Sequence, residues 1–196
     1  MQKEKEENEE NEPKKIILQG TNNRYQMKKA MKTEVKKDKK RKETEKWNTT
    51  TNDFTYENQM NLLNEIQEKK EPINSIHKLF IQQIERKIAS YKQQDLEKKK
   101  YDDQKTIDYD YVLSLFLETQ CKCFYCFSEV FILYEIVREE KQWTLDRINN
   151  DLGHNLDNVV LSCLKCNLKR RCQSKDGFLF TKQLKIVKME NNEVFH

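Results

Sequence analysis

Apolar positions are distributed unevenly along the chain. They are sparse in residues 1–52 and dense in residues 109–184. A segment as polar as the first one cannot bury enough apolar surface to offset the entropy that it would lose on ordering. We therefore predict a disordered, charged tail over residues 1–52, a helical region over 53–104 and a small folded module over 105–190.

The predicted helical region carries one apolar stripe. Pro72 breaks or restarts the helix expected from about Tyr56. After this proline, apolar residues recur at spacings of three and four: Ile73, Ile76, Phe80, Ile84, Ile88 and Tyr91. Such spacing is typical of an amphipathic helix. We expect its stripe to pack against the module or against a partner, which includes self-association with a second copy of the chain.

The module is expected to combine one helix with short strands. Asp108 occupies a favoured N-cap position for a helix that ends at about Thr119. Apolar runs then predict strands over residues 130–137, 143–148 and 159–162, with a turn-rich segment over residues 149–157. A basic helix is expected from Cys163 onward. The fold class is therefore α+β, and the module ends as strand, loop, strand, helix.

Composition and charge indicate a metal-stapled module with a polyanionic partner. The chain is 36% charged and 36% hydrophobic, and a module this small has trouble burying enough apolar surface, so a metal that staples it is expected. Its net charge is only +4, but residues 163–188 hold eight Lys or Arg and one acid. The candidate nucleic-acid contacts are Lys165, Lys169, Arg170 and Arg171. The basic run over residues 36–42 fits a nuclear-import signal or a DNA-gripping arm as well as a solvated tail.

The location is expected to be intracellular, in the cytoplasm or nucleus. We find no N-terminal apolar run of a signal peptide and no stretch of about 18 apolar residues, so neither secretion nor a membrane is expected. In a reducing compartment, six cysteines indicate metal ligands or free thiols rather than disulfides.

The strongest chemical signal is a pair of C-x-x-C motifs. Cys123 and Cys126 form the first, and Cys163 and Cys166 form the second. Two residues between cysteines let one tight turn present both sulfurs to a tetrahedral ion, and thiolates favour zinc over harder cations. We therefore predict a structural Zn²⁺ site with these four ligands. Thirty-six residues separate Cys126 from Cys163, which is more than a zinc ribbon needs and enough for an inserted hairpin.

The inserted segment resembles a known family. It contains Leu145-Asp146-Arg147-Ile148, a Gly153-His154 loop and Asn158-Val159, and it ends in Cys163-Leu164-Lys165-Cys166-Asn167. The order and spacing resemble those of the zinc-binding HNH endonucleases, over about residues 108–172. The resemblance implies a small ββα-metal (HNH) module stapled by the four-cysteine zinc site. It also implies hydrolysis of phosphodiester bonds in DNA.

The resemblance further assigns roles to individual residues. Asp146 and Asn167 would bind a catalytic divalent cation, Mg²⁺ or another, which suits oxygen ligands. Asn158 would hold the loop or the general base in orientation. The family's base is a His directly after the Asp, where this chain has Arg147, which cannot accept a proton. Arg147 would instead clamp a phosphate, and we expect His154, on the loop of the hairpin, to act as the base.

Three functions remain open at this point. The first is a metal-dependent DNA endonuclease, and the second is a non-catalytic, degenerate HNH module that binds nucleic acid, whether DNA or RNA. The third is an interaction protein that uses the helical stripe, with the zinc site as a staple. The substitution of Arg147 favours the second function. The joint presence of Asp146, Asn158 and Asn167 favours the first, because a purely structural zinc module needs none of them.

Overall fold

The computed structural model describes residues 38–69 and 74–184, together with Met27. The described chain from Asp38 onward forms one compact unit. Its elements are two 3-10 helices, η1 (Lys42–Lys46) and η2 (Thr51–Phe54), then α2 (Tyr56–Lys69), α3 (Ser75–Glu97), α4 (Tyr109–Glu118), β1 (Trp143–Arg147), β2 (Val159–Cys163), α5 (Leu164–Arg170) and α6 (Lys175–Gln183). The unit is thus mixed α and β, as predicted.

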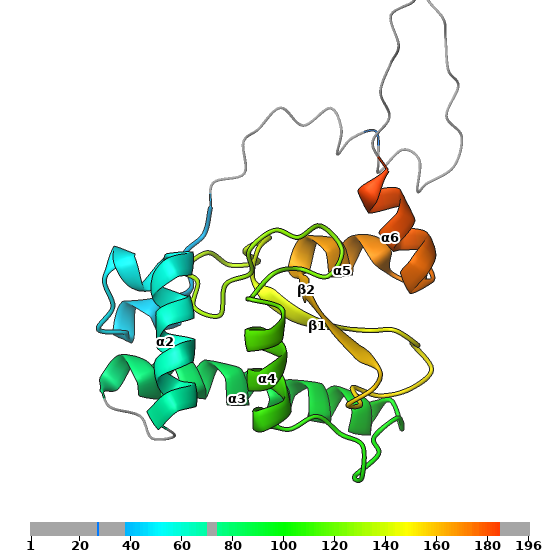
Figure 1. Cartoon of the computed structure of the whole chain (residues 1–196), viewed down its shortest axis with the longest axis horizontal. Coiled ribbons are helices and arrows are strands. Elements are labelled where there is room, and N and C mark those ends of the chain that lie inside the picture. Colours follow the sequence, from blue (N-terminus) through cyan, green and yellow to red (C-terminus); the bar gives the residue numbers. More distant parts are fainter. Residues whose placement is uncertain (1–26, 28–37, 70–73, 185–196) are drawn as a thin grey trace, which may run out of the picture. The chain divides into compact units, whose positions relative to one another are not determined.

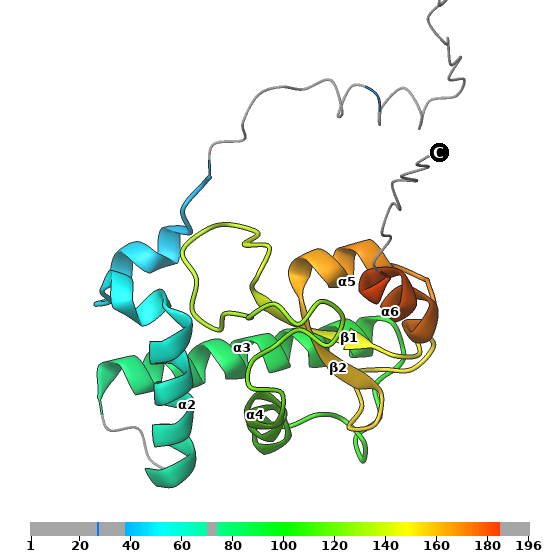
Figure 2. The ribbon, with the colours of Figure 1, turned by 45° about the horizontal axis from the view of Figure 1, so that its top comes forward.

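Helix α3 runs along the length of this unit. Figures 1 and 2 show α2 beside its first half and the β1–β2 hairpin beside its second half. Phe80 and Ile84 are completely buried, and Tyr91 is 7% exposed. The predicted stripe therefore packs inside the chain, with Ile76 and Ile88 partly buried at its edges. Ile73 lies outside the described residues. No helix in the described ranges is long and apolar enough to cross a membrane.

The hairpin is antiparallel and short. Its register pairs Trp143 with Cys163 and Asp146 with Val160. Because side chains alternate along a strand, Trp143 and Leu145 face α3 and α4, and Thr144 and Asp146 face α5. Trp143 anchors the first face with edge-on contacts to Tyr91 and Phe116, at centroid distances of 6.4 and 5.0 Å. Helix α4 begins after Asp108, whose Oδ1 accepts a hydrogen bond from the Tyr111 amide at 2.8 Å, so the predicted N-cap is present.

The strand predicted over residues 130–137 is absent from the described structure. Ile132 and Leu133 are fully buried, but within a loop. The side chain of Gln59 on α2 replaces a neighbouring strand: its Oε1 accepts from the amides of Ile132 (2.8 Å) and Leu133 (3.1 Å). Its Nε2 donates to the Leu133 carbonyl at 3.0 Å. A distant polar side chain thus satisfies the buried backbone, which an apolar run alone does not reveal.

The predicted tail ends earlier than residue 52, because residues 38–52 pack against the folded unit. The Arg41 amide donates to the Glu135 carbonyl at 2.7 Å, and the Val137 amide donates to the Lys39 carbonyl at 2.8 Å. The Arg41 guanidinium lies over the ring of Tyr134, 4.2 Å from its centroid. The end of the basic run therefore has a structural role. The rest of the tail, apart from Met27, lies outside the described residues, as do residues 185–190 of the predicted module.

Candidate functional site

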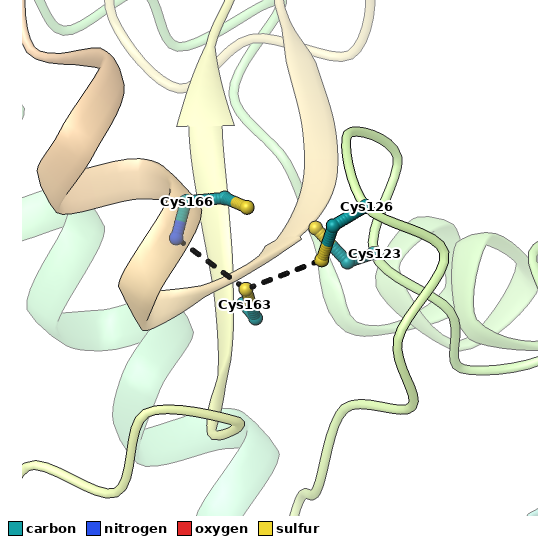
Figure 3. A group of neighbouring side chains, drawn as sticks. All are labelled: Cys123, Cys126, Cys163 and Cys166. Carbon is teal, nitrogen blue, oxygen red and sulfur yellow. Dashed lines mark hydrogen bonds between the residues drawn. The ribbon is translucent and has the colours of Figure 1, made fainter. Parts of the chain in front are cut away.

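The four predicted zinc ligands come together. The sulfur atoms of Cys123, Cys126, Cys163 and Cys166 all lie within 4.8 Å of one another. Figure 3 shows two of them on the loop after α4, facing the other two where β2 passes into α5. Three of these residues are buried, and Cys126 is half-buried. Four converging thiols from two turns are compatible with a tetrahedral structural zinc.

Backbone hydrogen bonds shape the first cysteine turn. The amide of Cys123 donates to the Ser128 carbonyl at 2.8 Å, and the amide of Phe127 donates to the Cys123 carbonyl at 2.9 Å. Phe127 has φ of +56°, the left-handed conformation that glycine adopts more easily. The Phe124 amide donates to the Leu161 carbonyl at 2.8 Å, which joins this turn to β2.

The thiols cannot all ionise without a cation. Hydrogen bonds from the Cys163 and Cys166 side chains lower the pKa of Cys123 far below that of a free thiol. The same bond to Cys123 raises the pKa of Cys163 to about 12, and bonding to Cys123 also raises the pKa of Cys166. The neighbouring thiols therefore compete to ionise. A divalent soft cation would relieve this competition by favouring the thiolate form at every sulfur.

Beside the cysteine cluster, Asp146 forms a buried ion pair with Arg170. The Nε of Arg170 donates to Oδ2 at 2.5 Å, and Nη2 donates to Oδ1 at 2.8 Å. Asp146 is 5% exposed and Arg170 is 1% exposed. The sequence predicts that Arg170 contacts a phosphate at the surface, and the structure corrects this prediction. The reason is helical geometry: Arg170 lies on the face of α5 that packs on the hairpin.

Asn167 lies one turn before Arg170 on the same face of α5. Its Nδ2 donates to the Thr144 hydroxyl at 3.1 Å and more weakly to the Leu145 carbonyl at 3.4 Å. The amide oxygen is not used in these bonds. Asn167 thus lies against Thr144 and Leu145, which precede Asp146 on β1. A carboxylate and an amide oxygen in this arrangement fit a hard divalent cation in donor type, with Arg170 as the present partner of the carboxylate.

Asn158 closes the loop of the hairpin. It is 4% exposed. Its Oδ1 accepts from the Asn149 amide at 2.8 Å, and its Nδ2 donates to the carbonyls of Asn149 (3.0 Å) and Gly153 (2.9 Å). Of the two roles that the resemblance offers, these bonds match that of holding the loop.

His154 lies against α3. Its Nδ1 is 3.0 Å from each carboxylate oxygen of Asp95, and its backbone amide donates to Asp95 at 2.6 Å. Its ring stacks on Tyr91 at a centroid distance of 4.4 Å. Burial lowers its pKa, against the opposing effect of Asp95. The contacts with Asp95 and Tyr91 give His154 a structural role, and its role as the general base stays a prediction.

The remaining residues predicted to contact nucleic acid differ in whether another side chain or carbonyl already binds them. Lys169 and Arg171 are exposed. Lys165 is exposed too, but its ammonium pairs with Glu140 at 2.6 Å. Arg147 is half-buried and donates to the Leu152 carbonyl at 3.0 Å, which orients the loop. Of the predicted contacts, Lys169 and Arg171 are thus the ones that are exposed and form no ion pair with the described residues.

Two residues of the site were not predicted. Asp95 continues the α3 stripe at four residues past Tyr91, and a carboxylate on a buried stripe signals a buried partner. Tyr125 lies between the first two cysteines, and its hydroxyl donates to Oδ2 of Asp146 at 2.7 Å. An aromatic with a polar tip inside a cysteine turn was the available signal.

Comparisons with protein-family models, with curated proteins and with solved structures find no match to this chain. Function is therefore inferred from the chain's own residues.

Proposed function

We propose that the chain is a metal-dependent endonuclease of the HNH type that hydrolyses phosphodiester bonds in DNA. One observation carries the proposal. A short antiparallel hairpin runs directly into α5, and Asp146 and Asn167 lie on the same side of this unit, next to the four-cysteine cluster. A zinc staple alone requires neither the carboxylate nor the amide.

In this proposal the two metals have separate tasks. Zinc on the four cysteines holds the first cysteine turn to the β2–α5 junction. Asp146 and Asn167 would hold Mg²⁺ or a similar cation, which supplies charge neutralisation at the scissile phosphate. The chain's own residues hold the loop through Asn158 and meet the DNA backbone through Lys169 and Arg171. Reduced cysteines suit action inside the cell.

The test is nicking of supercoiled plasmid by zinc-loaded protein with Mg²⁺ or Mn²⁺. The informative variant is Asn167→Ala, because Asn167 is only half-buried. Asp146→Ala would leave the Arg170 guanidinium buried without its partner, and loss of fold would then mimic loss of chemistry. Wild type should nick and Asn167→Ala should not, at equal zinc content. Absence of nicking by folded wild type with either cation counts against the proposal.

A second candidate is a non-catalytic HNH module that binds nucleic acid. The ion pair between Asp146 and Arg170 favours it, because it occupies the carboxylate, and so does the placement of His154 with Asp95. This candidate predicts salt-dependent DNA binding by wild type with no cleavage in any divalent cation.

A further inference from the structure

The Asp146 carboxylate has two prospective partners of the same charge sign. We propose that Arg170 and a divalent cation compete for Asp146, so that Arg170 is a positioning residue that controls occupancy of the cation site. This inference rests on the proposed function, because it takes Asp146 and Asn167 as the cation ligands. It goes further by naming the group on this chain that regulates the site.

Further hydrogen bonds hold the Arg170 guanidinium in the ion pair. Besides both Asp146 oxygens, Arg170 donates to the Gln173 carbonyl at 2.6 Å through Nη1 and to the Arg147 carbonyl at 2.5 Å through Nη2. Its partners therefore come from β1 and from the turn after α5. The residue that follows, Arg171, has φ of +51° and ψ of −112°, an uncommon backbone conformation for a residue other than glycine. That turn brings the Gln173 carbonyl to the guanidinium.

Burial explains why the carboxylate needs this partner. An isolated buried carboxylate is costly, and a bidentate guanidinium offsets much of that cost. Two donors from Arg170 and one from Tyr125 already share its two oxygens. One lone pair of Oδ1 remains, but a divalent cation on it would lie beside the guanidinium, where repulsion between like charges is strong. Cation binding and the intact ion pair therefore oppose each other.

Competition has a measurable consequence. The apparent affinity for the cation is the intrinsic affinity multiplied by the fraction of molecules in which Asp146 is free. The ion pair lowers that fraction. Release of Arg170 would also leave a guanidinium at the end of α5, beside the exposed Lys169 and Arg171. Weakening the pair should tighten cation binding even though it weakens the fold.

The experiment is Mn²⁺ titration of zinc-loaded protein, followed by the electron paramagnetic resonance signal of free Mn²⁺. Arg170→Gln removes the charge, and Arg170→Lys keeps it but cannot bridge both oxygens. Arg170→Gln should bind Mn²⁺ at least about tenfold more tightly than wild type, with Arg170→Lys in between. Without Mn²⁺, Arg170→Gln should melt at a lower temperature than wild type, and Mn²⁺ should restore part of the loss. Adding Asn167→Ala to Arg170→Gln should abolish the gain in affinity.

Equal Mn²⁺ affinity of wild type and Arg170→Gln, or no binding by either, would overturn the competition. If Arg170→Gln does not fold, Arg170→Lys decides in the same way: tighter binding than wild type supports competition, and equal binding refutes it. The proposed function fails separately. If wild type nicks plasmid but binds Mn²⁺ as tightly as Arg170→Gln does, only the proposed competition is refuted. If the two proteins differ in Mn²⁺ affinity but wild type does not nick, only the proposed nuclease activity is refuted.

Discussion

The hydroxyl of Tyr125 donates a hydrogen bond of 2.7 Å to Oδ2 of Asp146. Tyr125 lies between two cysteines of the predicted zinc site, and Asp146 lies on β1 in the candidate cation site. The Tyr125 ring packs edge-on against Phe178 of α6 at 5.0 Å. The cysteine turn therefore positions the Asp146 carboxylate directly, and loss of zinc should disturb both sites together.

Removing a zinc ligand should unfold the module. Cys163→Ser breaks the tetrahedral set at the junction of β2 and α5, and structural zinc contributes folding free energy directly. We expect less than one zinc per chain by elemental analysis and loss of the near-ultraviolet circular dichroism of buried Trp143. Cys172→Ser is the matched control, since Cys172 is exposed and outside the cluster. Retention of one zinc by Cys163→Ser would refute this assignment.

The turn after Cys126 should gain stability from glycine. Phe127 has φ of +56° and its side chain is 62% exposed, so it accepts backbone strain while burying little surface. Phe127→Gly should raise the free energy of unfolding by roughly 0.5–1 kcal/mol, measured by urea denaturation. Ala89→Gly, at an exposed position inside α3, should instead lower it by about 1 kcal/mol. A lower stability of Phe127→Gly would contradict the prediction.

His154 should affect stability and its pH dependence. His154→Ala leaves Asp95 buried without its partner and should cost about 2–3 kcal/mol. Because the folded state lowers the pKa of His154, its contribution is present above the unfolded value of about 6.5 and is lost as pH falls through the folded value. His154→Gln does not titrate. Urea denaturation at pH 7 and pH 5 should show a larger loss for wild type than for His154→Gln, and equal losses would contradict this.

Exposed cations near α5 should control DNA affinity. Replacing Lys169 and Arg171 by Ala removes two proposed phosphate contacts, so the slope of log affinity against log salt should fall by about 2. Binding should weaken for all sequences alike. The control replaces Lys46 and Lys78, exposed residues of η1 and α3, and removes the same charge. Fluorescence anisotropy with a labelled duplex measures both. Equal effects of the two double variants would show that only net charge matters.

The features of the fold that the sequence predicts are those that depend on the spacing of residues close in sequence. The cysteine spacing identified the four thiols that cluster. The alternation of apolar residues located β1 and β2, spacings of three and four located α3, and the Asp108 N-cap located the start of α4. The failures concern partners distant in sequence. The Gln59 side chain hydrogen-bonds the buried backbone at Ile132. His154 is bonded to Asp95, and Arg170 forms an ion pair with Asp146. Each depends on which polar side chain reaches a buried group, and spacing along the chain carries no such information.

The most direct measurement of the central claim is the single-turnover cleavage rate of an end-labelled duplex by zinc-loaded wild type and Asn167→Ala in Mn²⁺. We predict cleavage by wild type and a rate at least about 10² lower for Asn167→Ala, because a ligand of the cation that stabilises the transition state is lost. Zinc content and DNA affinity should stay unchanged. Equal rates for the two proteins, or no cleavage by folded wild type that binds the duplex, would contradict the assignment as an endonuclease.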